Sequence, residues 1–271
     1  MSCFPRDCWA VRDRRDVAER LRTELLGGEP EEWLPRLAEA AFHRRDLFEA
    51  LLEICHAALP FDPRRAYEVS EVALELGRRL RELVPEIASV ESFGRALCLG
   101  SHARRLLGDH PGAEALLESA AVLPLDPAER GFFCRAMALL RWDEGRFEEA
   151  ASLLSQASRR YQELGDAREE GICLALMGFL RTAKGEMRQG EAFLRKSMET
   201  LDPQSRPRLV AEARLTLALG LARTDRKAEA QYLWQEAWSL YSQIPNPDAL
   251  FSLVWREGQV AYALGDWAQR L

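Results

Sequence analysis

A six-residue pattern recurs at a fixed spacing in the second half of the chain, and this spacing constrains the fold more than any other feature. The pattern is Gly-Arg-Phe-Glu-Glu-Ala at 145–150, and related segments follow every 40 residues at 185–190, 225–230 and 265–270. Each segment is preceded, at the same distance, by a small residue: Ala138, Gly178, Ala218 or Gly258. A period of this length is typical of proteins built from one repeating supersecondary unit.

A pair of antiparallel helices explains the pattern. A Gly or Asp turn reverses the chain, and a small residue on each helix lets the two backbones approach closely. On the second helix this residue is Ala150 or Ala230, and less regular copies of the pattern lie at 61–66 and 108–113. Each hairpin leaves one apolar side uncovered, so neighbouring hairpins must stack. Leu, Ala, Glu and Arg dominate the composition and favour helix. We therefore expect an all-α fold.

Apolar periodicity and the positions of the prolines place the helices. They are predicted near 6–26, 30–43, 45–59, 63–83, 86–107, 111–122, 127–143, 146–164, 168–184, 187–201, 207–223, 226–243 and 248–264. Proline removes a backbone donor and ends the preceding helix, which accounts for breaks at Pro60, Pro85, 124–127, 203–207 and 245–247.

The repeat resembles the tetratricopeptide repeat, because a large apolar and then a small residue precede a Gly-x-aromatic-x-x-Ala turn. The resemblance covers residues 44–271, in the longer, about 40-residue form found in bacterial proteins. It implies a right-handed α-solenoid of antiparallel helix hairpins. Repeats start near 47, 94, 131, 171, 211 and 251, with the last incomplete, and 1–43 is expected to form an N-terminal helical cap. The chain departs from the consensus at Cys134, Leu174, Arg214 and Val254.

Composition argues against several classes of partner. A net charge of −6, with acids and bases interleaved, creates no large basic field for nucleic acid or an anionic membrane. No stretch reaches the roughly 20 apolar residues of a membrane helix, and residues 1–15 lack the apolar core of a signal peptide. We expect a cytoplasmic protein. Cys98, Cys134 and Cys173 fall in predicted helices, where buried thiols are the simplest interpretation.

Motifs for catalysis or cofactor binding are missing from the sequence. It contains no phosphate-binding loop, no His-Glu-x-x-His and no Cys-x-x-Cys. Ser101 lacks the second glycine of a nucleophile elbow, since Ala103 stands there. Cys3, Cys8, Cys55 and His56 have no usual metal-ligand spacing. We therefore predict no enzymatic activity, no metal and no cofactor.

The resemblance implies that the first helix of each repeat lines a concave face that binds a protein or peptide. The residues that this register selects as candidates are Arg95, His102, Arg105, Arg135, Trp142, Phe179, Leu219, Trp255, Gln259 and Tyr262. The lining is basic at one end and apolar at the other, which fits an acidic segment with apolar anchors. The alternative is that the aromatic side chains pack on the next repeat.

Two functions follow from this interpretation. The first is a protein-interaction scaffold or adaptor without enzymatic activity. The second is a regulatory or sensor region of a larger transcriptional regulator or signalling enzyme, whose active domain lies outside this chain. The sequence does not identify the partner.

Overall fold

The computed structural model describes residues 19–83, 90–224, 226–241 and 258–259. Within these ranges the regular structure is helical and contains no strand, which confirms the all-α prediction. The chain divides into two compact units, Met1–Leu140 and Arg141–Leu271. Each unit is described by itself.

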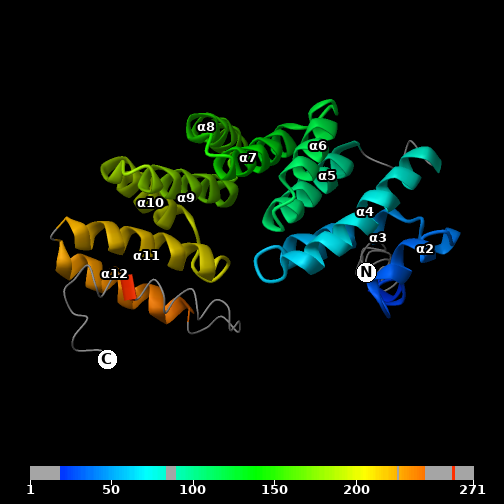
Figure 1. Ribbon diagram of the computed structural model, residues 1–271, viewed down its shortest axis with the longest axis horizontal. Helices are drawn as coiled ribbons and strands as arrows, with labels where there is room; N and C mark the ends of the chain where they lie inside the picture. Colours follow the sequence, from blue (N-terminus) through cyan, green and yellow to red (C-terminus); the bar gives the residue numbers. More distant parts are fainter. Residues whose placement is uncertain (1–18, 84–89, 225, 242–257, 260–271) are drawn as a thin grey trace, which may run out of the picture. The chain divides into compact units, whose positions relative to one another are not determined.

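Unit 1 begins with short helical turns and continues in longer helices. The short turns are η1 (Pro30–Glu32), α2 (Trp33–Arg36) and η2 (Ala40–Phe42), and the longer helices are α3 (Arg45–Ala58), α4 (Pro63–Leu83), α5 (Val90–Leu106) and α6 (His110–Ala121). α3 packs against α4, α4 against α5 and α5 against α6 (Figure 1). The next helix, α7 (Pro127–Asp143), starts in unit 1 and ends in unit 2.

Unit 2 continues the same plan. Its helices are α8 (Phe147–Leu164), α9 (Ala167–Ala183), α10 (Met187–Thr200), α11 (Pro207–Arg223) and α12 (Lys227–Tyr241). α9 pairs with α10 and α11 with α12, while α8 packs on α9 and α10 on α11 (Figure 1). From residue 45 onward, each described helix boundary lies within one residue of its predicted position, except where the neighbouring residues lie outside the described ranges.

The predicted single helix over 30–43 is wrong. Glu39 is extended, with φ −77° and ψ 128°, and separates α2 from η2. Trp33, Leu37 and Phe42 are all buried, but on one straight helix Phe42 would point about half a turn away from Trp33. A broken helix lets all three side chains be buried. Pro35 helps because it has no N–H to continue the helical hydrogen bonding.

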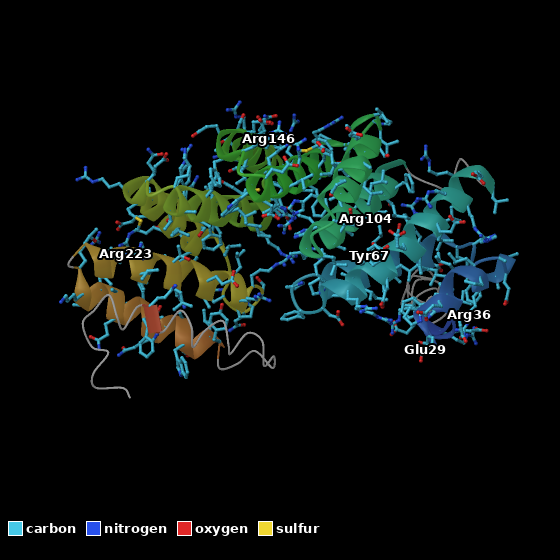
Figure 2. All side chains as sticks on the ribbon, in the orientation of Figure 1. Glu29, Arg36, Tyr67, Arg104, Arg146 and Arg223 are labelled. Carbon is cyan, nitrogen blue, oxygen red and sulfur yellow. The ribbon has the colours of Figure 1, made fainter. Side chains whose placement is uncertain are left out.

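Arginine and histidine side chains satisfy the carbonyls that this broken segment leaves open. Arg36, labelled in Figure 2, donates from Nη1 to the carbonyls of Glu24, at 2.9 Å, and Gly27. Arg79 on α4 donates from Nη1 to the carbonyl of Leu37 at 2.6 Å, and His43 Nε2 lies 2.8 Å from the same oxygen. Residues 24–43 are therefore held to each other and to α4.

The recurring sequence pattern forms the hairpin turn. Gly108, Gly145 and Gly185 adopt left-handed backbone conformations, with φ of 83°, 77° and 82°. The residue after each glycine donates its N–H to a carbonyl five residues earlier, as between Glu186 and Arg181 at 2.9 Å. This geometry ends the first helix and directs the chain into the second.

Small residues bring the two helices of a hairpin together, as the pattern predicts. A Cβ added to Gly178 on α9 would lie 2.6 Å from Cγ of Leu194 on α10. A Cβ on Gly190 of α10 would lie 3.1 Å from the carbonyl oxygen of Gly178. The equivalent residues Ala150, Ala218 and Ala230 are fully buried. The backbones in these hairpins leave no room for larger side chains.

A charged residue joins neighbouring hairpins in unit 1. Arg104 on α5 donates from Nη2 to Glu71 on α4 at 2.9 Å and from Nη1 to Asp109 at 3.1 Å. Its guanidinium also lies 5.4 Å from the centre of the Tyr67 ring on α4 (Figure 2). Arg104 thus links α4 and α5 at half-buried positions.

Ala230→Leu should destabilise the protein by about 1–3 kcal/mol, because the added carbons cannot fit between α11 and α12 without shifting a helix. Urea unfolding followed by circular dichroism measures the change. Ala228→Leu on the exposed side of the same helix is the matched control and should leave the midpoint nearly unchanged. Equal midpoints for both variants would show that Ala230 does not fix the helix distance.

Gly185→Ala should cost about 1–2 kcal/mol, because an L-residue at a φ of 82° is strained. No heavy atom lies within 4 Å of the added Cβ, so the loss comes from the backbone alone. Gly185→Asn should cost less, since asparagine tolerates this conformation better. Equal unfolding free energies for the two variants would contradict the assignment of the loss to the backbone.

Candidate functional site

The predicted candidates in unit 1 differ widely in exposure. Arg95 on α5 is exposed, while His102 and Arg105 on the same helix are half-buried. Arg135 on α7 is buried, with 8% of its surface exposed, and its guanidinium lies 4.9 Å from the centre of the Phe132 ring. Only Arg95 therefore presents its side chain largely to solvent.

Basic side chains from three helices surround His102. Arg105 Nη2 lies 3.1 Å from His102 Nε2, so the neutral ring accepts this hydrogen bond and carries its own proton on Nδ1. Burial, and after it the electrostatic effects of Arg105, Arg135 and His56, together lower the pKa of His102 to about 3. We call His56, His102, Arg105 and Arg135 the basic cluster of unit 1.

Buried thiols occur in both units. Cys55, Cys98, Cys134 and Cys173 are all buried, each as a thiol, which confirms the interpretation of Cys98, Cys134 and Cys173. Burial raises the pKa of Cys55 to about 12, and burial also raises the pKa of Cys98. Such thiols are poor nucleophiles at neutral pH. Cys3 and Cys8 lie outside the described residues.

In unit 2 the apolar candidates are partly covered. Trp142, Phe179 and Leu219 are half-buried. Phe179 packs against a cluster on α10, α11 and α12 that includes Leu194, Leu217 and Leu233. This contact supports the alternative in which an aromatic side chain on a first helix packs on the next repeat. Gln259 is exposed, and Trp255 and Tyr262 lie outside the described residues.

The first helices, which the resemblance expects to line a concave face, also contain core residues. Cys98 on α5, Ala175 on α9 and Leu215 on α11 are 0 to 1% exposed. In the described part of the chain, such a lining would consist mainly of half-buried side chains.

Sequence reasoning missed an exposed aromatic pair on α12. Tyr232 is 58% exposed and Trp238 is 39% exposed. Neither occupies a first helix, so the family register did not select them. A helical projection of α12 could have identified them, because Ala230, Leu233, Ala237 and Tyr241 form its buried side and both aromatic residues lie off that side.

The described residues contain neither a candidate metal site nor a candidate membrane span. Among these residues no group of three or more His, Cys, Asp or Glu side chains could hold a metal ion. None of the helices in the described ranges is long and apolar enough to cross a membrane.

These features define an all-α protein of packed helix hairpins. No model of a known protein family matches the sequence, and no curated protein does. Among solved structures, the crystal structure of BtubC (BKLC) from P. vanneervenii is similar, with a TM-score of 0.60 and 19% sequence identity. The match covers 77% of this chain and 86% of that chain. At this identity the likeness shows a common fold alone.

His102 should make the stability of the protein fall in mild acid. Its pKa in the folded protein is about 3, below the ordinary histidine value of 6.5, so the unfolded state binds the proton more readily between these values. Folding stability therefore decreases as pH falls below about 6.5, by at most about 1.4 kcal/mol per pH unit and less for a half-buried ring. Urea unfolding at pH 7 and pH 5 measures the loss.

His102→Gln is the informative variant, because glutamine can still accept a hydrogen bond from Arg105 but does not titrate. It should lose less stability than the wild type between pH 7 and pH 5. If the two proteins lose equal amounts, the imidazole does not resist protonation in the folded state.

Proposed function

We propose that this chain is a cytoplasmic, tetratricopeptide-type adaptor that binds a segment of a partner protein and carries out no reaction itself. The packed hairpins with glycine turns at Gly108, Gly145 and Gly185 support the family assignment. The buried thiols with raised pKa values at Cys55 and Cys98 fit a structural role for those cysteines.

The observation that carries the proposal is the basic cluster of unit 1. The fold brings His56 on α3, Arg105 on α5 and Arg135 on α7 close enough to His102 on α5 for all three to interact with it electrostatically. Arg95 lies two helical turns before His102 on α5 and is exposed. A carboxylate-bearing segment of a partner could pair with the exposed Arg95 beside this cluster.

The half-buried apolar side chains of unit 2 support a second contact. Phe179 and Leu219 are each half-buried, so part of each large apolar side chain is exposed. Packing between the helices holds the rest of the α9–α11 layer in place. Side chains that are already ordered lose little conformational entropy on binding. An apolar anchor of the partner could therefore bind here with little reorganisation.

Arg95→Glu should weaken binding of the acidic partner segment about tenfold, because it replaces an exposed cation with an anion that repels carboxylates. The partner is identified by co-purification, and the affinity of its segment is measured by fluorescence anisotropy at two salt concentrations. Wild-type binding should weaken at high salt.

Arg188→Glu on α10 is the matched control, since Arg188 is also exposed but lies in unit 2, outside the basic cluster. It should bind like the wild type. Equal affinities for Arg95→Glu and the wild type at low salt would refute the basic surface as the binding site.

A further inference from the structure

The helices α10 and α12 are the second helices of two successive hairpins, and the sequence pattern relates them by a shift of 40 residues. One side of α10 faces the hairpin that follows it. Leu194 and Met198 on this side pack with Leu217 of α11, and Leu201, directly after α10, packs with Val210 of α11. The structure therefore shows which side of a second helix receives the next hairpin.

The corresponding side of α12 is apolar and only partly covered. Trp234 and Trp238 stand 40 residues after Leu194 and Met198. Trp234 is half-buried and Trp238 is 39% exposed. Their ring centres lie 6.1 Å apart, at an interplanar angle of 33°. We call Gln231, Trp234, Gln235 and Trp238 the stacking side of α12.

The acidic side chains of α12 are directed to other neighbours. Glu229 contacts Arg195 on α10, in the preceding hairpin, and Glu236 pairs with Arg214 on α11 at 3.1 Å, in the same hairpin. Glu236 also accepts a hydrogen bond from the hydroxyl of Tyr232 at 3.0 Å. At 100° per residue, both acids and Tyr232 lie outside the stacking side. None of the four residues of the stacking side carries a charge.

We propose that the stacking side of α12 is covered by the C-terminal segment 248–270 of the same chain, in the way that α11 and the start of α12 cover α10. Of this segment only residues 258–259 belong to the described ranges, and both are helical. Pro207 begins α11, and Pro247 stands 40 residues later, directly before the segment. The sequence thus repeats the connection that returns α11 onto α10.

The short connection favours this segment over any other occupant. Residues 242–247 separate the end of α12 from the segment and can span at most about 20 Å. A flexible link of this length gives the tethered segment an effective concentration in the millimolar range at α12. A second copy or a partner protein would have to displace it. The chain itself is therefore the favoured source of the covering helix.

The residues of the segment complement those of α12. Leu194 and Leu217 belong to one cluster between α10 and α11, and their counterparts 40 residues later are Trp234 and Glu257. An indole N–H can donate a hydrogen bond to a carboxylate, so the pair stays compatible although both members differ. Leu253 replaces a smaller alanine of α11 and offers apolar surface to the exposed indole ring.

The polar edge of the contact changes in the same concerted way. Glu191 on α10 pairs with Arg226 of the next hairpin at 2.9 Å, and the counterparts of this pair are Gln231 and Asp266. A glutamate at 231 would face a second carboxylate, and like charges repel. Glutamine avoids this repulsion and can donate a hydrogen bond to Asp266. This inference does not depend on the proposed binding of an acidic partner by unit 1.

A double-mutant cycle on the full chain tests the contact. Trp238→Ala and Leu253→Ala should each lower the urea midpoint measured by circular dichroism. The double variant should lose clearly less than the sum of the two losses, because either change alone already breaks the shared contact. Tyr232→Ala, on another side of α12, is the matched control, and its loss should add to that of Leu253→Ala. Additive losses for Trp238→Ala and Leu253→Ala would overturn the proposal.

Cross-linking distinguishes the chain's own segment from a second copy. A Cβ on Gly220 of α11 would contact the methyl group of Met187 on α10, and the counterparts of these positions are Val260 and Lys227. Lys227→Cys combined with Val260→Cys should be joined within one chain by a short bis-maleimide reagent, above the background of the wild type. Peptide mass spectrometry identifies the linked sites.

Ala228→Cys combined with Val260→Cys is the matched control, because residue 228 is exposed beside Lys227 but lies off the stacking side; it should give little linked product. A link between two chains would assign the surface to a second copy and overturn the proposal. Equal yields for the two cysteine pairs, or no link above background, would also overturn it.

Discussion

The close approach of two helix backbones within each hairpin is the constraint on which the rest of the structure depends. At Gly178 and Gly190 the neighbouring atoms leave no room for even a methyl group, and Ala150, Ala218 and Ala230 fill the equivalent positions without exposed surface. Because the helices are this close, Leu194 of α10 lies directly over Gly178 and also reaches the next hairpin, where it packs with Leu217 and Leu233. The close contact within a hairpin is thus coupled to the packing between hairpins.

Packing between hairpins combines an apolar layer with ion pairs at its edge. Leu194, Leu217 and Leu233 belong to one buried cluster drawn from α10, α11 and α12. At its border, Arg226 pairs with Glu191 at 2.9 Å and with Glu229, and Arg195 contacts both acids. These charged groups are partly exposed, and exposed pairs contribute about 0–1 kcal/mol each. Apolar burial therefore supplies most of the stability, and the ion pairs align α10 with α12.

This packing limits which surfaces remain available for a partner. Phe179 is partly used in joining α9 to the cluster on α10–α12, and Arg135 is almost fully covered. Arg95 is exposed beside the basic cluster of unit 1, and Tyr232 and Trp238 are exposed on α12 of unit 2.

The sequence by itself determined the helices and their turns, because these depend on local interactions. The glycine at 185 permits a left-handed turn, prolines end helices, and the small residues at 178, 190 and 230 mark where helices meet. Tertiary structure alone decided the break within 30–43, since Trp33 and Phe42 could not both be buried on one straight helix. It also decided which candidate residues remain exposed. Arg95 and Arg135 share a residue type and a predicted role, yet one is exposed and the other buried, because side-chain burial depends on neighbours that are distant in the sequence.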